Sequence, residues 1–476
     1  MDTAAFLKHL EAQPDYDGQM VHIEHIPFRE AKYGQLDEPL DDSLQASLVQ
    51  HDITCLYSHQ AEAVNHARRG KNVMVATSSA SGKSLCYNVP VIQELLTEPM
   101  SRAIYLFPTK ALAQDQLRSL RELFSTELFK PEEFATFDGD TPPLERVDIR
   151  QNARIILTNP DMLHLGILPN HQSWTKVLRH LRYVVVDEAH VYRGVFGSHV
   201  AGVLRRLRRL CRIHGSNPQF ICCSATIANP GEHAGKLTGL PFSVVDKDGS
   251  PHGAKDFVFW NPPLIDKVTN TRKSANSEAT NLFTGLVQEK VRTLTFARTR
   301  RLTEIIYRYS RDKLTEINPA LARRIKPYRA GYLPEERRQI EKDLFGGKLI
   351  GAVATVALEL GIDIGDLEAT VLTGYPGSIA STWQQAGRSG RGMAPSMSFL
   401  IGLDGPLDQY LMHHPEFFFQ RNFENALVNP ENTYILRGHL LCAAWEHPLT
   451  GGDAAFFGTR FPEEREGLAK QGLLRE

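Results

Sequence analysis

The stretch YVVVDEAHVYRG, residues 183–194, decides the fold class because it carries an apolar run to a pair of carboxylates. Tyr183 and the three valines after it are typical of a short strand that is covered on both faces. The run ends on Asp187 and Glu188, and burying such a pair is unfavourable unless a cation, a proton or a reacting water uses it. An isolated acidic pair usually marks a solvated turn, so its meaning depends on the rest of the chain.

The composition is that of a globular protein with no general affinity for polyanions. The 476 residues suffice for about three domains. Basic and acidic residues, 54 and 55 in number, give a net charge of −1, so a nucleic-acid site has to be a local cluster. The start, MDTAAFLKHLEAQPDYDG, does not resemble a signal peptide, and no apolar segment approaches the roughly 20 residues of a membrane helix. We therefore predict a cytoplasmic protein without a membrane partner.

The six cysteines include no C-x-x-C pair, and only Cys222 and Cys223 are close in sequence. This spacing favours buried, reduced thiols and supports neither a zinc site nor a disulfide framework.

Apolar runs alternate with amphipathic stretches between about residues 72 and 245, which indicates βαβ units and a parallel sheet. The expected strands are NVMVAT, RAIYLF, ARIILTN, YVVVDEA and QFICCSAT. The pattern stops at a turn-rich segment, 246–263, which we interpret as a hinge. It resumes with RTLTFA, GAVATVA, ATVLTG and SMSFLIG, and helices are expected to begin near Thr299, Pro334 and Ser378. After about residue 405 the pattern is helical.

We therefore predict an α/β protein with four parts. Residues 51–250 and 251–420 are expected to form successive parallel-sheet domains, followed by a helical segment at 421–476. Residues 1–50 contain no convincing strand pair and are expected to form an accessory segment. In the helical stretch LRRLRRLCRI, the leucines at 204, 207 and 210 mark a buried face, so its arginines are expected to be solvated.

Residues 77–84, TSSASGKS, fit the phosphate-loop pattern except at its first position, where Thr77 replaces glycine. A predicted strand precedes the loop and a predicted helix follows it, as the motif requires. Backbone N–H groups at the helix start can hold a phosphate, Lys83 would reach the outer phosphates of ATP, and the Ser84 hydroxyl would bind Mg²⁺. The residues expected to bind the nucleotide here are Ser79, Ala80, Ser81, Gly82, Lys83 and Ser84.

The phosphate loop gives the acidic pair a function. In phosphate-loop NTPases a strand-end acid holds Mg²⁺, and an adjacent glutamate can orient and deprotonate the attacking water. Asp187 fits the first role and Glu188 the second, so ATP and Mg²⁺ are the predicted cofactors. His190 by itself is expected to be structural, but with the Ser-Ala-Thr sequence at 224–226 it fits a link between nucleotide state and domain position.

The order of the motifs resembles that of the superfamily-two, DEAH-box helicases. The motifs are Gln60 in LYSHQ, the phosphate loop, PTKALAQDQ, TNPDML, DEAH, SAT, TLTFARTRR, ATVALELGIDIGD and QQAGRSGR. The connecting text, such as VYRGVFGSHV and DQYLMHHPE, is similar to the bacterial MrfA (YprA-type) DNA helicases and their fungal RecQ-like type-four relatives. The resemblance implies two tandem RecA-like domains followed by a partial winged-helix segment at 421–476. It also implies that Gln60 contacts the nucleotide and that Asp363 binds the ribose hydroxyls.

In QQAGRSGR, residues 384–391, Arg388 and Arg391 are three residues apart and are expected on one side of a helical turn. We predict that they act as arginine fingers on the γ-phosphate and that Gln384 contacts the lytic water or the phosphate. The resemblance also implies DNA contacts whose hydroxyl, amide and cationic groups can bond phosphate oxygens without reading bases. A capping or surface role is an equal alternative for each of these residues, which are Lys110, Thr158, Asn159, Arg298, Arg329 and Thr355.

The leading hypothesis is an ATP-dependent DNA helicase that translocates along single-stranded or forked DNA, 3′ to 5′ by resemblance, in DNA repair. One alternative is an RNA-remodelling ATPase, against which DEAH rather than DEAD weighs. Another is an ATP-switched clamp that binds nucleic acid without unwinding it, against which Glu188 and the two arginines weigh. A metabolic phosphate-loop kinase would leave the second domain unexplained.

The sequence stops at 472–476, where the wing strands of a winged helix would follow, and relatives in this branch continue into a domain with four zinc-binding cysteines. The chain is expected to be either a natural minimal form or a truncated one, and we favour truncation, because a winged helix without its wing leaves an apolar face uncovered. Residues from about 425 onward are therefore predicted to be the least stable part of the chain. We also expect no stoichiometric zinc, and weaker unwinding than the ATPase activity would suggest.

Overall fold

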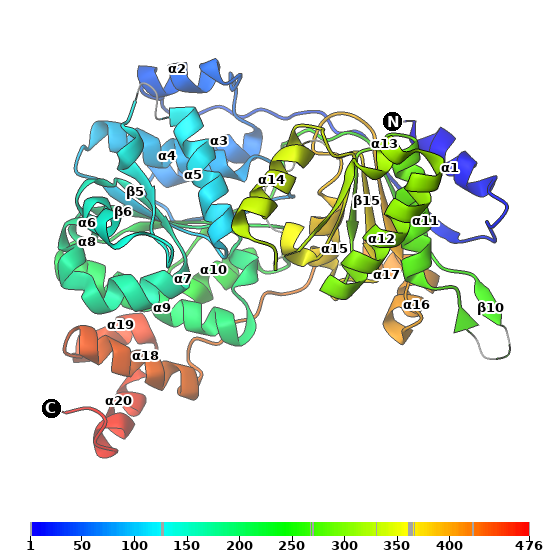
Figure 1. Cartoon of the computed structure of the whole chain (residues 1–476). Helices are drawn as coiled ribbons and strands as arrows, with labels where there is room; N and C mark the ends of the chain where they lie inside the picture. Colours follow the sequence, from blue (N-terminus) through cyan, green and yellow to red (C-terminus); the bar gives the residue numbers. More distant parts are fainter. Residues whose placement is uncertain are drawn as a thin grey trace. The chain divides into compact units, whose positions relative to one another are not determined.

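The computed structural model describes residues 2–124, 128–266, 268, 271–329, 331–359, 365, 367–420 and 423–475. Two compact units share the chain, and each is made from two separate stretches (Figure 1). Unit 1 consists of Met1–Ala31 and Ser250–Glu424, and unit 2 of Lys32–Gly249 and Asn425–Glu476. Among the described residues, no helix is long and apolar enough to span a membrane.

Unit 2 is built on a parallel sheet of seven strands. Their order is β4 (Phe134–Thr136), β5 (Ile155–Thr158), β3 (Arg102–Leu106), β6 (Leu181–Val186), β7 (Gln219–Ser224), β2 (Val73–Ala76) and β8 (Ser243–Val245). The five strands predicted for this domain are confirmed, and β4 and β8 are short additions at the two edges. Because all seven strands are parallel, the loops after their carboxyl ends open along one edge of the sheet, where open α/β sheets bind ligands.

Helices cover both faces of this sheet, as the near-continuous apolar strands require. One face packs on α2 (Asp42–Gln50), α3 (Ser58–Arg68), α4 (Lys83–Thr97) and α5 (Lys110–Phe124). The other face packs on α6 (Pro143–Asn152), α7 (Pro160–Met162), α8 (Thr175–Arg179), α9 (Gly194–His214) and α10 (Pro230–Thr238). The result is a three-layer arrangement, which agrees with the βαβ units and the parallel sheet predicted for the first domain.

Unit 1 holds the second sheet, whose order is β1 (Met20–Ile26), β9 (Lys255–Trp260), β16 (Ser396–Ile401), β15 (Ala369–Thr373), β12 (Thr293–Phe296), β14 (Gly351–Ala354) and β13 (Ile325–Tyr328). The four strands predicted here are confirmed. The pair β1–β9 is antiparallel, and the other pairs are parallel. A small hairpin, β10 (Leu264–Asp266) with β11 (Thr271–Arg272), is separate from the sheet.

The first residues of the chain differ from the expectation of an accessory segment without a strand pair, because β1 extends the sheet of unit 1. The helix α1 (Thr3–Glu11) buries Phe6, Leu7 and Leu10 in the same unit. The strand was missed because its sequence, MVHIEHI, is only partly buried and its partner is more than 200 residues away. The segment interpreted as a hinge, 246–263, likewise contains β9, which lies between β1 and β16 in this sheet.

The helices of unit 1 also form two layers. One layer contains α11 (Ala275–Gln288), α12 (Arg300–Ile317) and α13 (Pro319–Ala322). The other contains α14 (Pro334–Phe345), α15 (Ile379–Ala386), α16 (Pro406–His413) and α17 (Pro415–Phe419). The three predicted helix starts are confirmed: Thr299 and Ser378 cap α12 and α15 with their side chains, and α14 begins at Pro334.

The described cysteines are all free, and Cys86, Cys211, Cys222 and Cys223 are buried as predicted. Cys55 is exposed, against the expectation, because it lies in the loop before α3. Within the described residues, no group of three or more His, Cys, Asp or Glu side chains could hold a metal ion.

Two of the last helices, α18 (Thr433–Glu446) and α19 (Ala454–Phe457), pack on α9 of unit 2, and α20 (Phe461–Lys470) packs on α18 and α19 (Figure 1). Arginines of α9 hold them, so the expectation that the arginines of LRRLRRLCRI are solvated is wrong for Arg205, Arg206 and Arg209, which are buried, whereas Arg212 is exposed. Arg206 is completely buried and donates to both oxygens of Glu446 at 3.1 and 3.2 Å through Nε. Arg209 donates to Asp453 at 2.8 Å. Apolar periodicity did not predict the burial of Arg206 and Arg209, because a guanidinium can be buried when a carboxylate from another segment pairs with it.

These contacts attach residues 425–476 to α9, and the low stability of this segment stays a prediction. Removing one partner of such a buried ion pair would leave an uncompensated charge. We expect Arg206→Ala to destabilise the attachment of α18–α20 by about 3–5 kcal/mol and to make this segment sensitive to protease. The measurement is limited proteolysis with mass spectrometry, together with thermal unfolding.

The matched control is Lys470→Met, which removes a largely exposed ion pair to Glu466 and should leave the cleavage pattern and the unfolding temperature unchanged. The double variant Arg206→Met with Glu446→Leu should restore protease resistance. A wild-type cleavage pattern in Arg206→Ala would contradict the role given to this pair.

Candidate active site

The phosphate loop lies between the end of β2 and the start of α4 in unit 2. Gly82 caps α4 with a positive φ of 75°, and Ala80 also has a positive φ of 63°. The positive φ favours glycine at position 82, and a Cβ there would lie 2.5 Å from Nε2 of Gln60, so the Gln60 amide would have to shift. The loop is therefore shaped by backbone conformations that most side chains disfavour.

Thr77, which replaces the usual first glycine of the motif, has a structural explanation. Its hydroxyl shares a hydrogen bond of 2.7 Å with the Ser81 hydroxyl, and both side chains are buried. Lys83 donates to the carbonyl of Ser78 at 2.7 Å and to that of Thr77 at 3.2 Å. With Thr77 in place of glycine, the loop is therefore still closed, and the Lys83 amine is bonded to its carbonyls.

Gln60 and its neighbour hold the loop from α3. Gln60 donates to the Gly82 carbonyl at 2.9 Å and accepts from the Tyr57 N–H at 2.9 Å. The buried His59 ring lies 3.0 Å from the Ser81 carbonyl through Nε2 and accepts from the Gly249 N–H at 3.2 Å. Gln60 was predicted from the LYSHQ motif, whereas His59 was not, because its only signal was its place beside Gln60.

Asp187 and Glu188 follow β6 at the same edge of the sheet. Asp187 accepts from the Glu188 N–H at 2.9 Å and from the Tyr87 hydroxyl at 3.3 Å. Burial, followed by the charge of Glu188, raises the pKa of Asp187 to about 7. Glu188 itself has a left-handed backbone, with φ of 50° and ψ of 42°. A strained residue beside a buried carboxylate is the arrangement that functional sites retain and structural turns avoid.

His190 connects this turn to the Ser-Ala-Thr sequence after β7, as the sequence suggested. Its Nδ1 accepts from the Ala225 N–H at 3.3 Å and lies 3.3 Å from the Ser224 hydroxyl. Burial lowers the pKa of His190, which keeps the ring neutral and Nδ1 able to accept.

In unit 1, α15 ends at Ala386, so Arg388 and Arg391 do not lie on a helical turn as predicted. The chain leaves the helix at Gly387, and Gly390 has a positive φ of 69°. Arg388 is 4% exposed and donates to the Glu359 carbonyl, whereas Arg391 is partly exposed. Gln384 is buried on α15. The prediction of a helical turn was wrong because Gly387 and Gly390, two glycines within four residues, disfavour a further turn of helix.

The expected DNA contacts divide into two groups. Lys110 and Arg298 are exposed, and Arg329 pairs with Glu304 at 3.0 Å and stacks on Tyr332. Thr158, Asn159 and Thr355 instead use their side chains within the fold. The Thr158 hydroxyl is buried and donates to the Phe137 carbonyl at 2.6 Å, Asn159 caps α7, and Thr355 caps a short 3₁₀ helix at Val356–Leu358. These contacts agree with the capping or structural alternative, and DNA binding by Thr158, Asn159 and Thr355 stays a prediction. Asp363 lies outside the described residues.

A phosphate loop, a strand-end carboxylate pair and a coupled Ser-Ala-Thr turn on one parallel sheet define a phosphate-loop NTPase domain. The DEAD/DEAH box helicase family matches residues 57–233, and the helicase conserved C-terminal domain matches 276–393. The winged helix domain of the ATP-dependent helicase HRQ1 matches 428–476. The chain belongs to the superfamily-two DEAH-box helicases, in the group that contains MrfA, YprA and HRQ1.

Three relatives illustrate this kinship. The chain is 47% identical to the uncharacterized ATP-dependent helicase YprA of Bacillus subtilis over 96% of its own length and 60% of that protein. It is 42% identical to the ATP-dependent helicase hrq1 of Schizosaccharomyces pombe, over 96% of this chain and 44% of the relative. A crystal structure of the DUF1998 helicase MrfA bound to DNA and AMPPNP is 44% identical, with a TM-score of 0.91 over 99% of this chain and 65% of that one.

The raised pKa of Asp187 predicts a pH-dependent cost in the protein without nucleotide. A folded-state pKa of about 7 lies above the value of about 4 in an unfolded chain. The folded state therefore holds an extra proton between these values, and stability falls as pH rises towards 7, by at most about 4 kcal/mol. We expect Asp187→Asn to unfold at a higher temperature than wild type at pH 8, with little difference near pH 4.5.

Thermal unfolding without nucleotide or Mg²⁺ at both pH values is the measurement. Asp140→Asn, a change at a largely exposed carboxylate, is the control and should shift neither value. Equal unfolding temperatures for Asp187→Asn and wild type at pH 8 would refute the burial argument.

Proposed function

We propose that this chain is the motor part of an ATP-dependent DNA helicase. The observation that carries the proposal is the carboxylate pair at the end of β6, in which Asp187 is buried and Glu188 has a strained backbone, on the same sheet edge as a closed phosphate loop. The DNA- and AMPPNP-bound state of the related MrfA structure supports ATP and DNA as the ligands. The chain spans only part of each relative, so the activity of the whole protein is part of the proposal.

The residues present fit ATP with Mg²⁺. Asp187 is a buried carboxylate whose ionised form requires a nearby cation, and Mg²⁺ prefers one or two protein oxygens together with phosphate oxygens. The Ser84 hydroxyl, in the first turn of α4, is the second protein oxygen in this proposal. Lys83 would exchange the carbonyls of Thr77 and Ser78 for phosphate oxygens, and the N–H groups of Ser79–Ser84 would surround the β-phosphate.

Glu188 accepts the proton of the attacking water in this proposal. Its left-handed backbone turns the side chain away from the direction that β6 would give it, and His190 lies beside it, 3.5 Å from Oε2. Because Nδ1 of His190 accepts from Ala225, it does not donate to Glu188 at the same time. The carboxylate of Glu188 thus keeps its capacity to accept a proton.

We assign the positive charge for the γ-phosphate to Arg388 and Arg391 of unit 1, with Gln384 beside them. Arg388 is fixed by the Glu359 carbonyl, which favours a preset orientation, and Arg391 is the more exposed of the two. Ribose binding by Asp363 stays a prediction. For DNA we retain the exposed Lys110 and Arg298 together with Arg329, because their cationic groups can bond phosphates of any sequence. Movement in the 3′ to 5′ direction and a role in DNA repair belong to the proposal as well.

The first test separates nucleotide binding from hydrolysis. Lys83→Ala should abolish measurable ATP binding, whereas Glu188→Gln should keep ATP affinity within about threefold and lower kcat at least about a hundredfold, because it removes only the base. Equilibrium binding of a fluorescent ATP analogue and steady-state ATPase assays measure the two effects. Wild-type turnover in Glu188→Gln would remove this residue from the mechanism.

The second test concerns the nucleic acid. Single-stranded DNA at low salt should raise kcat of the wild type, and Arg391→Ala should lower the stimulated kcat at least about tenfold while ATP affinity changes little. Matched DNA and RNA strands, and forked duplexes of each, distinguish the DNA motor from an RNA-remodelling ATPase and from a clamp that does not unwind. If neither nucleic acid changes the ATPase rate, the motor proposal fails.

A further inference from the structure

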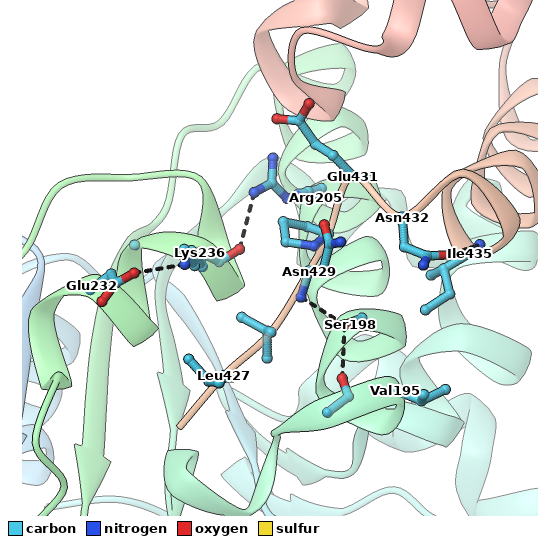
Figure 2. Close-up of a pocket in the computed structure, with 14 residues that line it drawn as sticks. Val195, Ser198, Arg205, Glu232, Lys236, Leu427, Asn429, Glu431, Asn432 and Ile435 are labelled. Atoms are coloured by element: carbon cyan, nitrogen blue, oxygen red, sulfur yellow. Dashed lines mark hydrogen bonds and ion pairs between the residues drawn. The ribbon is translucent and has the colours of Figure 1, made fainter. Parts of the chain in front are cut away.

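Residues Glu424–Asn429, which we call the strap, join the last residue of unit 1 to the C-terminal helices of unit 2. The strap is extended: Ala426 and Val428 are buried, at 3% and 7% exposed, while Asn425, Leu427 and Asn429 face solvent. The two inward residues belong to the hydrophobic core beneath α9 and α10. With these helices the strap bounds a cavity of about 850 Å³ (Figure 2).

The backbone of the strap is anchored at the start of α9, a few residues after the DEAH turn. The Gly194 N–H donates to the Leu427 carbonyl at 2.7 Å, and the Asn429 N–H donates to the Ser198 hydroxyl at 2.9 Å (Figure 2). A Cβ on Gly197 would lie 2.7 Å from Val428. Glycine at 197 therefore permits a close approach that no other residue allows.

The side chains of Asn229, just before α10, and of His233, within α10, contact the backbone of Ala426. Asn229 accepts from the Ala426 N–H at 2.9 Å and donates to its carbonyl at 3.3 Å. His233, which is completely buried, lies with Nδ1 3.1 Å from the same carbonyl. Its Nε2 lies 2.9 Å from the carbonyl of Ala189, the third residue of DEAH. One imidazole thus connects the strap with the turn that holds Glu188.

Both neighbours of His233 are carbonyls, which only accept, so the ring can bond either of them only through a nitrogen that carries a proton. Burial lowers the pKa of His233, and a neutral ring has one N–H, which serves one carbonyl at a time. Each carbonyl has a second donor: Asn229 for Ala426, and the Tyr192 N–H at 3.1 Å for Ala189. The proton of His233 can therefore lie on either side without leaving a buried acceptor unpaired.

The other end of the strap holds an element of unit 1. The carboxylate of Glu424 accepts from the N–H groups of Ile379 and Ala380, at 2.6 and 3.2 Å. These N–H groups lie in the first turn of α15 and therefore have no partner within the helix. The helix dipole also favours a negative charge there. The same helix carries Gln384 and leads to Arg388. One residue separates Glu424 from Ala426.

We propose that the strap couples the two halves of the ATPase, with Glu424 positioning α15 and with Asn229 and His233 positioning the DEAH turn. A change at α15 is then passed along three residues of chain to Ala426, and from there through His233 to the carbonyl of Ala189. None of these three side chains contacts the reacting atoms; they act by positioning other residues. This inference rests on the proposed function, since it explains how nucleic acid bound to the chain changes hydrolysis.

The test uses Glu424→Gln and Asn229→Ala, with Asn425→Ala as the matched control on the exposed side of the strap. We expect both test variants to keep DNA-free kcat and KM for ATP within about twofold and to lose DNA stimulation by at least about fivefold, the usual lower range of a coupling effect. The double variant should lose no more than either single variant, because both act through one strap. The control should be stimulated like wild type.

Each outcome has a distinct meaning. If wild type is not stimulated by DNA, the proposed function fails, whereas stimulated wild type with equally stimulated Glu424→Gln and Asn229→Ala overturns the strap alone. Additive losses in the double variant also overturn it. Unfolding temperatures show whether a variant is folded, and if Asn229→Ala is not, Glu424→Gln with His233→Asn takes its place. His233→Asn keeps a donor near Ala426 but not near Ala189, so it should remain folded and lose stimulation.

Discussion

The burial of one carboxylate, Asp187, is the constraint on which the rest of unit 2 depends. Its pKa of about 7 shows that the fold places an acid where an isolated negative charge is unfavourable. The surroundings meet this constraint with the Tyr87 hydroxyl, the N–H of a strained Glu188 and the nearby charge of Lys83. A bound cation and phosphate would stabilise the ionised carboxylate of Asp187. The unfavourable burial in the ligand-free protein therefore contributes to the free energy of ligand binding.

The helix α9 connects the turn that follows Asp187 with the C-terminal helices. It begins directly after the DEAH turn, and its first turn binds the strap through Gly194 and Ser198. Further along, its buried arginines pair with Glu446 and Asp453. The winged-helix segment is therefore an extension of the first ATPase domain, held by charge pairs that tolerate little displacement because each is almost fully enclosed.

Local sequence predicted the elements that have strong local causes. The β-branched runs around Val184 and Val371 became strands, and Thr299, Pro334 and Ser378 started helices because capping is decided within one turn. The phosphate loop and the acidic pair were predicted for the same reason, because each is a local motif that residue type and spacing are enough to identify. The strand β1 was missed because pairing with a distant segment, and not its own pattern, makes it a strand.

The sequence by itself thus determined two parallel-sheet domains, a nucleotide site at the end of two strands and the family to which the chain belongs. Only the tertiary structure decided that Arg206 is buried, that Arg388 lies beyond its helix, and that His233 lies between Ala426 and Ala189. The physical reason is that a polar side chain carries no periodic signal of burial. Its position depends on a partner from a distant segment, and that partner is known only when the chain has folded.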